Sequence, residues 1–384
     1  MIRFGKKAAI LTAAGALAAM SVTGCSGSIN TDAVVATVGD EDITLGVANF
    51  YARMTQGQYE TYYASMMGTT GEAMWTQEAG EDQTYEESVK DSLMENLQNM
   101  YLISQHAADY EVSLTEDEKD AISEAAEQFS EANTDEAKEV VSGYKKDVEK
   151  FLELATIQTK MDSKMREGVD EEVSDEEAAQ KAMKYVFFSY TSTDDSGNST
   201  TLSDDEKEGL KTDAQSLADR VKAGEDISAV AEEMGQTAYD LTFDSESTSP
   251  NEDLIAAVDA FETEGETTDV IEADDGLYVG QLTSLLDRDA TDQKKASIVE
   301  QRRQDQYDSL LEEWRNSTDI SVDDKVWAKV DFEDTGVTII TSETEDTSSD
   351  DSSTDGSNSD TSDGSTSDNT GAADGAGAED GAAE

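Results

Sequence analysis

Cysteine, histidine and proline are almost absent from this chain of 384 residues, which contains one of each. The single cysteine, Cys25, excludes a disulfide bond within the chain, so stability must come from buried surface. The single histidine, His106, has no cysteine or histidine beside it. We interpret it as a residue on a helix face and predict no metal site. The scarcity of proline is atypical of a stalk that crosses a cell wall.

Basic residues are also scarce, because 27 Lys and Arg face 88 Asp and Glu and the formal net charge is −61. Nucleic-acid binding depends on basic residues that neutralise phosphates, so we expect no nucleic-acid partner. The same charge repels anionic lipid head groups. Adjacent acidic pairs are expected by chance in so acidic a chain, and none has the spacing of an EF-hand calcium loop: Asp194-Asp195, Asp204-Asp205 and Asp274-Asp275.

The short motifs of hydrolases and nucleotide-binding proteins are missing from the sequence. It contains no G-x-S-x-G nucleophile turn, no H-E-x-x-H zinc motif and no phosphate-binding loop. These are the patterns that carry those chemistries. The sequence therefore predicts no cofactor.

The first 24 residues have the pattern of an export signal. Met1 to Lys7 is basic, residues 8–20 are apolar and small residues follow, which is the order of a secretory signal peptide. The apolar run is shorter than the roughly 20 residues that span a bilayer. Its end, Val22-Thr23-Gly24-Cys25, resembles a bacterial lipobox.

The lipobox resemblance implies that the chain is cleaved before Cys25 and that a lipid is attached to this thiol. The acyl chains then hold the protein at the extracytoplasmic face of the cell membrane without a spanning helix. Residues 25–32 form a short tether after the anchor. The alternative is that Cys25 is an ordinary buried or unpaired thiol.

Residues 33–180 are predicted to be mostly helical after a short strand and turn. Ala33–Val38 has the apolar pattern of a strand, and Thr44 is suited to cap the helix that follows. Apolar residues at helical spacing predict another helix over 84–108. Capping boxes predict two further helix starts, at Thr115 with Glu118 and at Ser174 with Glu177.

Tyrosine and methionine are concentrated in one stretch of this helical region. The stretch has two interpretations: a buried core stripe, or an adaptable groove, since Met side chains repack around varied apolar partners. A chaperone for unfolded chains needs a groove of that kind, surrounded by charge. The residues are Tyr51, Met54, Tyr59, Tyr62, Tyr63, Met66, Met67, Met74 and Trp75.

The pattern changes at Met183, where "KYVFFSYTSTD" has the aromatic and β-branched composition of a strand. Short helices then alternate with the strand-like runs "TAYDLTFDSES" and "LYVGQLTSLL", which predicts an α+β fold with an antiparallel sheet. A long polar helix follows over 290–314. Residues 342–384 contain no apolar side chain larger than Ala and are predicted to be a disordered acidic tail. That tail is either a solvated end or a spacer that binds cations.

The order of these segments resembles the extracytoplasmic foldases of the PrsA/SurA type. In that family, N- and C-terminal helical segments form one chaperone domain, and a parvulin-type (PpiC-type) prolyl isomerase domain is inserted between them. The resemblance implies a helical chaperone domain over 33–180, a parvulin-like domain over 181–284 and a return helix over 285–335. "VATVGDEDIT" is similar to the opening of the family's first domain.

The inserted segment resembles a parvulin that has lost its polar residues. Gly265-Glu266-Thr267-Thr268 and Gly276-Leu277-Tyr278-Val279 stand where the family has Gly-Glu-Val-Ser and Gly-Tyr-His-Ile. We expect each glycine to permit a tight turn at a strand edge. The two pocket histidines of parvulins fall at Val186 and Tyr278, so both are missing. The resemblance implies a peptide pocket lined by Val186, Phe187, Phe188, Phe243, Phe261 and Tyr278.

The resemblance implies a membrane-anchored foldase or chaperone whose partners are unfolded secreted proteins. Prolyl isomerisation needs no covalent step. It needs only a site that stabilises the twisted amide and so lowers the rotation barrier of ~18–20 kcal/mol. Without the histidines we expect isomerase activity to be weak or lost. The alternative is a non-catalytic lipoprotein of the cell surface with a structural or ligand-binding role.

Overall fold

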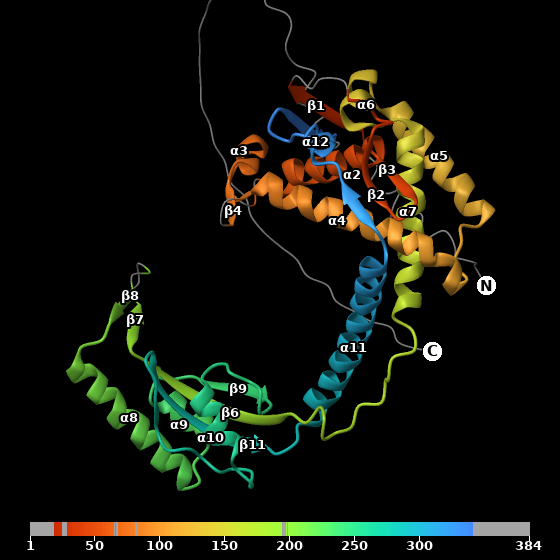
Figure 1. The fold of residues 1–384 in the computed structure, drawn as a ribbon. Coiled ribbons are helices and arrows are strands. Elements are labelled where there is room, and N and C mark those ends of the chain that lie inside the picture. The colour runs from red at the N-terminus through yellow and green to blue at the C-terminus, as the bar shows by residue number, and fades with distance from the viewer. Residues whose placement is uncertain are drawn as a thin grey trace, which may run out of the picture. The chain divides into compact units, whose positions relative to one another are not determined.

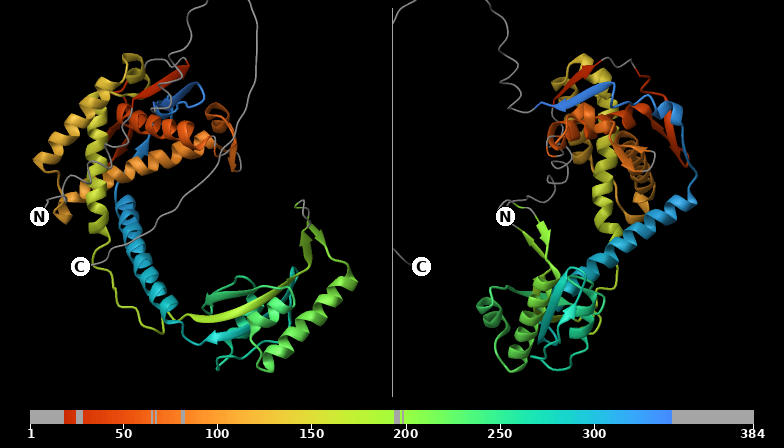
Figure 2. Two further views of the ribbon diagram at one scale, coloured as in Figure 1. Left: turned by 180° about the vertical axis from the view of Figure 1, so that it is seen from behind. Right: turned by 90° about the vertical axis from the view of Figure 1, so that its left-hand side faces the viewer.

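The structure is a computed structural model that describes residues 19–24, 29–64, 66, 68–80, 83–193, 197 and 199–340 (Figures 1 and 2). Cys25, Met67, most of the predicted export signal and the tail of residues 342–384 lie outside the described residues. The described part combines helices with several small antiparallel sheets, which confirms the α+β class. None of its helices is long and apolar enough to cross a membrane.

The first elements form a small sheet that leads into a helix. β2 (Val34–Val38) and β3 (Glu41–Thr44) form an antiparallel hairpin, and β12 (Ile320–Val322) pairs with the other edge of β2. The Thr44 hydroxyl accepts a bond from the Val47 backbone N–H at 3.5 Å, so this predicted cap begins α2 (Leu45–Gln58). α2 continues into a π-helical turn, η1 (Tyr59–Tyr63).

Helices dominate the next hundred residues. The Thr115 capping box predicted from the sequence is present, and a second box joins Thr84 to Glu87. α4 packs against α2 and α7, and α5 packs against α7. The elements are α3 (Gly71–Trp75), β4 (Glu78–Gly80), β5 (Gln83–Thr84), α4 (Tyr85–His106), η2 (Ala107–Tyr110), α5 (Glu116–Ala132), α6 (Asp135–Val141) and α7 (Lys145–Met165).

The helix predicted to start at Ser174 does not form. The Ser174 hydroxyl accepts the predicted bond from the Glu177 N–H at 3.1 Å, but only turns follow. The backbone N–H of Gln180 bonds instead to the Thr291 hydroxyl at 3.1 Å, and a strand begins at the next residue. Pairing of this backbone with distant partners therefore outweighs the local capping signal.

A four-stranded antiparallel sheet forms the next part of the chain, with β6 (Lys181–Ser189) and β11 (Gly276–Ser284) at its centre. Its strand order is β10-β11-β6-β9, where β9 is Ala238–Phe243 and β10 is Ile271–Glu272. A hairpin of β7 (Thr191–Thr193) and β8 (Ser199–Thr201) follows β6. One apolar cluster joins the sheet to α8 (Asp204–Lys222) and α9 (Ile227–Glu233), and a second joins it to α10 (Glu252–Asp259).

The two glycines matched to the parvulin pattern have different roles. Gly265 has φ of +89° and makes the turn that the sequence predicts. Gly276 begins β11 and has no left-handed backbone; a Cβ there would lie 2.3 Å from the Phe188 carbonyl oxygen. Gly276 is thus required by close packing against β6, and the expected tight turn is not its role.

The last described elements return to the first helices. α11 (Arg288–Ser317) packs against α4 and α7, and α12 (Asp324–Trp327) packs against β2. The final strand, β13 (Thr335–Ile339), pairs antiparallel with β1 (Met20–Gly24). The largest apolar cluster accordingly joins the first helices to the segment that follows α11, and its members include Trp75, Tyr101, Trp314, Trp327 and Phe332.

Candidate functional site

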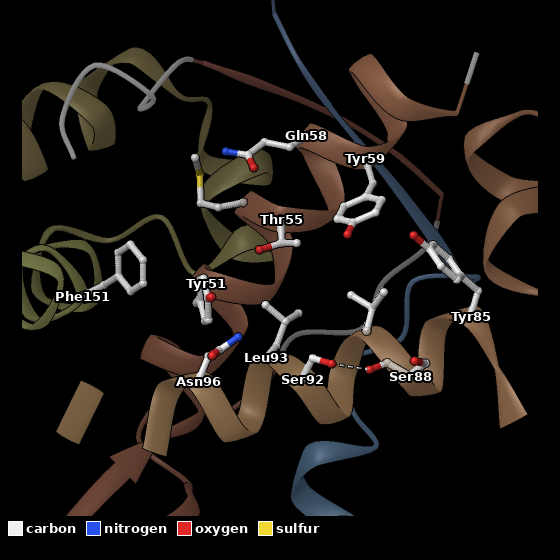
Figure 3. A pocket seen from close by; sticks show the side chains of 12 residues that line it. Tyr51, Thr55, Gln58, Tyr59, Tyr85, Ser88, Ser92, Leu93, Asn96 and Phe151 are labelled. Atoms are coloured by element: carbon white, nitrogen blue, oxygen red, sulfur yellow. Dashed lines mark hydrogen bonds between the residues drawn. The ribbon is translucent and has the colours of Figure 1, made fainter. Parts of the chain in front are cut away.

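A cavity of about 560 Å³ lies between α2 and α4 and is closed at one end by a side chain of α7 (Figure 3). This volume falls in the range of about 300–1,000 Å³ typical of ligand pockets. Figure 3 shows the α2 and α4 side chains facing one another across it. The lining residues are Tyr51, Met54, Thr55, Gln58, Tyr59, Tyr85, Ser88, Val89, Ser92, Leu93, Asn96 and Phe151.

Helical spacing explains how the sequence places these residues together. On α2, the lining positions Tyr51, Met54, Thr55 and Gln58 follow the i, i+3, i+4, i+7 pattern, so they share one face of the helix. On α4, the same spacing runs from Tyr85 through 88, 89, 92 and 93 to 96. Two helix faces of mixed apolar and neutral polar character therefore form opposite walls.

Aromatic contacts fix both ends of the cavity. Tyr51 stacks on Phe151 with ring centroids 5.1 Å apart. At the other end, Tyr59 meets the Tyr85 ring edge at 5.9 Å and the Trp75 ring at 5.8 Å. Aromatic pairs at these separations stabilise a defined geometry, so the large walls of the cavity are preorganised.

The cavity is neutral although the chain is strongly acidic. All twelve described lining side chains are uncharged at neutral pH. Burial raises the pKa of the Tyr51 and Tyr85 hydroxyls, which keeps both protonated as donors. The remaining polar groups are the hydroxyls and amides of Thr55, Gln58, Tyr59, Ser88, Ser92 and Asn96, which can pair with peptide N–H and C=O groups.

The tyrosine- and methionine-rich stretch divides into three classes in the structure. Tyr51, Met54 and Tyr59 line the cavity, as the groove interpretation expects. Met74 and Trp75 are fully buried, as the core interpretation expects. Tyr62, Tyr63 and Met66 are exposed by 51%, 48% and 81%.

The α4 and α7 walls of the cavity were missing from the sequence-based site. The helical pattern of α4 contains Val89 and Leu93, but periodicity alone assigns both to a core. The pairing of α4 with α2, which opens a cavity between them, depends on tertiary packing. The available sequence signal for a cavity wall was the alternation of polar-tipped residues with those apolar ones: Tyr85, Ser88, Ser92 and Asn96.

The six residues predicted to line a peptide pocket on the sheet do not share one face. Successive side chains of a strand point to opposite faces. Val186 and Phe188 are buried in the cluster under α8 and α9. The structure brings the other four together in the cluster beside α10: Phe187, Phe243, Phe261 and Tyr278.

An aromatic row crosses three strands on that second face. Tyr239 of β9 stacks on Tyr185 of β6 at 5.4 Å, and Tyr278 of β11 stacks on Phe187 of β6 at 4.5 Å. A tilted contact of 6.3 Å between Tyr185 and Tyr278 joins the two pairs. Tyr239 is 47% exposed, so the row reaches solvent at the edge strand. The sequence-based site did not include Tyr185 or Tyr239.

The Tyr278 hydroxyl cannot replace a titrating histidine. It donates a hydrogen bond to Asp275 Oδ2 at 2.9 Å. Burial and the neighbouring Asp275 carboxylate raise the pKa of Tyr278 above its ordinary value, so the hydroxyl stays protonated at neutral pH. This position offers an aromatic surface and no proton transfer.

Metal ligands are not grouped in the described part of the chain, where no three His, Cys, Asp or Glu side chains are placed to hold an ion. His106 lies on α4, as predicted, and its Nδ1 is 3.2 Å from Asp109 Oδ2.

No protein-family model and no curated protein matches the chain. Solved foldase structures are similar to it in part. The foldase protein PrsA from Streptococcus pneumoniae is 18% identical, with 66% of this chain and 98% of that one covered and a TM-score of 0.28. The peptidylprolyl isomerase PrsA from Bacillus anthracis is 13% identical, with coverages of 59% and 96% and a TM-score of 0.24. PrsA from Bacillus subtilis is 15% identical, with coverages of 66% and 96% and a TM-score of 0.22.

Proposed function

We propose that this chain is a lipid-anchored extracytoplasmic chaperone of the foldase type, which binds unfolded secreted proteins in the cavity between α2 and α4. The observation that carries the proposal is a neutral, aromatic cavity of about 560 Å³ in a chain whose net charge is −61. An unfolded chain presents both the apolar side chains and the unpaired backbone groups that such a lining can bind.

Binding follows from the composition of the cavity. Apolar client side chains leave water against Tyr51, Met54 and Leu93, at about 25 cal/mol per Å² of apolar surface buried. The neutral amides and hydroxyls pair with the client backbone, which avoids the cost of burying an unsatisfied peptide group. No charged group or covalent chemistry takes part, so release requires only that apolar contacts and neutral hydrogen bonds are broken.

Exposed aromatic residues extend this binding surface along η1. Tyr63 contacts Tyr59 with ring centroids 5.3 Å apart, so the apolar surface continues from the cavity to the half-exposed Tyr62 and Tyr63. Such exposed apolar side chains mark interaction sites on soluble proteins. The surrounding negative charge keeps the chaperone itself soluble and monodisperse.

The lipid anchor places the chaperone where clients emerge. Cys25, which lies outside the described residues, carries the lipid in this proposal, and the support is the lipobox-like sequence before it. Fatty acyl chains supply the membrane affinity because the protein's charge opposes binding to anionic head groups.

Isomerase activity is weak or lost in this proposal. The row of Tyr239, Tyr185, Tyr278 and Phe187 offers a surface on which a proline ring can pack. Neither of the implied histidines is present, and the Tyr278 hydroxyl is already bonded to Asp275. The sheet then serves as a peptide-binding or structural module.

An aggregation assay tests the chaperone function. An unfolded secreted protein is diluted into buffer with or without the full chain, and light scattering is followed over time. The wild-type chain is expected to suppress scattering at a few-fold molar excess. Val89→Asp places a charge in the cavity wall and is expected to require at least a threefold higher concentration.

Val34→Asp is the matched control, because Val34 is 38% exposed and lies outside the cavity lining. It adds the same charge and should suppress aggregation as well as the wild type. Absence of suppression by the wild-type chain would contradict the chaperone function and favour a non-catalytic surface lipoprotein. Equal losses for the two variants would show that the cavity is not the client site. A proline-peptide isomerisation assay on the same samples is expected to give a rate close to the uncatalysed one.

A further inference from the structure

Residues at the end of the predicted export signal are built into the fold as β1. Met20 lies opposite Ile339 and Val22 lies opposite Val337 in the two-stranded antiparallel sheet β1-β13. Met20 is 4% exposed and belongs to the same apolar cluster as Val337 and Ile339, together with Phe50, Met54 and Phe129. The strand is therefore seated by two apolar side chains, at positions i and i+2.

Cleavage before Cys25 removes this strand from the mature protein. The opposite edge of β13 is already committed, because the Val337 and Ile339 N–H groups donate to Glu60 Oε2 and Thr61 Oγ1, each at 2.8 Å. Backbone groups alternate sides along a strand, so those of Gly336 and Thr338 face β1. Loss of β1 leaves these groups as an open strand edge.

Loss of Met20 with β1 also opens a hole for one long side chain beside this edge. Gly57 of α2 lies under Met20: a Cβ at Gly57 would be 3.2 Å from the Met20 methyl carbon and 3.5 Å from side-chain carbons of Val337 and Ile339. The glycine thus permits the strand to approach the helix closely. Removal of Met20 leaves an apolar hole whose walls are already in place.

A buried amide marks the end of the same groove. Asn133 is 5% exposed, its Nδ2 donates to the Phe129 carbonyl at 2.8 Å, and its Oδ1 accepts the Met20 backbone N–H at 2.7 Å. Without β1, the Asn133 Oδ1 atom loses this donor. The position therefore favours a ligand that supplies a backbone N–H, as Met20 does.

We propose that, in the processed protein, the edge of β13 accepts an extended segment of an unfolded client as a replacement strand. The segment lies antiparallel to β13, with a long flexible apolar residue in the hole over Gly57 and a second apolar residue two positions later. Its backbone N–H bonds to Asn133 Oδ1, and its ladder groups pair with Gly336 and Thr338. The uncleaved signal residues act as a placeholder that fills the site until processing.

This site deepens the proposed chaperone function and rests on it, and on cleavage before Cys25. Strand addition to an open sheet edge is a general mode of peptide recognition, in which the backbone gives affinity and alternate side chains give specificity. Met54 belongs to the β1–β13 cluster and also lines the α2–α4 cavity. One client chain can therefore engage both surfaces of α2.

The test is peptide binding to the processed and unprocessed full chains, prepared with identity checked by mass spectrometry. The probe is a fluorescein-labelled peptide Ala-Met-Ser-Val-Thr-Gly, the sequence of residues 19–24, read by anisotropy. The processed chain is expected to bind at least tenfold more tightly than the unprocessed chain, in which the site is filled. A probe with Asp in place of Met, and a processed Gly57→Leu variant that fills the hole, should each lose at least tenfold.

Three outcomes overturn the strand-accepting site. The first is equal binding by both forms or by both probes. The second is a processed chain that pairs with its own copies through β13, seen as a dimer by light scattering that the probe does not dissociate. The third is a processed chain that suppresses client aggregation without binding the probe, which leaves the chaperone function intact. Conversely, probe binding without suppression of aggregation would support the strand site and contradict the chaperone function.

Discussion

His106 and Trp314 stack with ring centroids 4.2 Å apart and an interplanar angle of 9°. His106 ends α4 and Trp314 lies near the end of α11, so this pair joins helices separated by some two hundred residues of sequence. Tyr110 meets the Trp314 ring edge at 6.1 Å. The only histidine of the chain therefore packs an aromatic surface, which agrees with its interpretation as a helix-face residue.

Loss of the Trp314 ring is expected to destabilise the helical part strongly. Trp314 is 7% exposed, and truncating a buried Trp to Ala typically costs about 3–5 kcal/mol. His106→Ala removes only the stacked partner and should cost about 1 kcal/mol. Urea denaturation followed by tryptophan fluorescence and circular dichroism measures both free energies of unfolding. Tyr62→Ala, at a 51% exposed position, is the control, and a Trp314→Ala value as small as the control's would refute the packing role.

The Glu60 carboxylate joins η1, α3 and β13. It accepts bonds from Trp75 Nε1 at 2.8 Å, from Gln56 Nε2 at 2.7 Å and from the Val337 N–H at 2.8 Å. Glu60→Ala leaves Trp75 Nε1 and the Val337 N–H without an acceptor, while Gln56 Nε2 still donates to the Thr335 carbonyl at 2.7 Å. The change is expected to cost about 2–4 kcal/mol of unfolding free energy. Glu60→Gln keeps the shape but converts one acceptor into a donor that faces Val337, so it should be intermediate. Glu78→Ala, at an exposed site of β4, should change stability by less than about 0.5 kcal/mol; a Glu60→Ala effect of that size would contradict the junction.

Local signals were sufficient for helix starts, as the bonds of Thr44 and Thr115 show. They failed at Ser174, where the local bond forms but the following backbone pairs with Thr291. The β1–β13 pair joins strands more than three hundred residues apart, and neither strand has a pattern that names its partner. Sequence periodicity indicates which face of a helix or strand is buried. Which element packs against that face depends on tertiary packing, which is defined only in the folded chain.

The division of the six predicted pocket residues between two faces of the sheet follows from information that the sequence did contain. Val186, Phe187 and Phe188 are consecutive, and consecutive strand residues cannot line one face. Applying the alternation would have left Phe187 with Tyr185 on one side, as the structure has them. The sequence contained only part of the information that defines the α2–α4 cavity. Tyr51 and Tyr59 were visible in the tyrosine- and methionine-rich stretch. Phe151 comes from another helix, whose position that stretch does not determine.

Asp147 is expected to make stability fall as pH rises from about 4 to about 6. The side chain is buried, and Oδ2 has no hydrogen-bond partner in the described part of the chain. Burial raises the pKa of Asp147 to about 6, against an opposing effect of Lys146 and a reinforcing one of Asp32. The unfolded carboxyl ionises near pH 4 while the folded one stays protonated, so the folded state binds more protons in this window.

The pH effect is isolated by comparing the wild type with Asp147→Asn. A one-unit pKa difference corresponds to about 1.4 kcal/mol, so the wild type should lose about 3 kcal/mol relative to the variant between pH 4 and pH 7. Urea denaturation at a series of pH values measures this difference, and the many surface acids cancel in it. Below pH 4 the difference in unfolding free energy between the two proteins should change little with pH. A difference that stays constant across the whole range would show that Asp147 does not titrate as argued.

The two histidine positions implied by the parvulin resemblance can be tested by restoring histidine. Val186 is fully buried in the cluster under α8 and α9, whereas Tyr185 lies on the face of Tyr278, with ring centroids 6.3 Å apart. Val186→His forces an imidazole into an apolar core and is expected to cost about 2–4 kcal/mol. Tyr185 is half-buried beside Tyr239, so Tyr185→His should cost about 1 kcal/mol of unfolding free energy, mainly from the lost aromatic stack. Of the three positions 185, 186 and 278, Tyr185 and Tyr278 share a face and Val186 lies on the other. The double variant Tyr185→His/Tyr278→His is therefore the one in which a proline-peptide assay should detect a gain over the wild-type rate. A stable Val186→His protein, with Tyr185→His unfolded, would reverse the assignment of the two faces of β6.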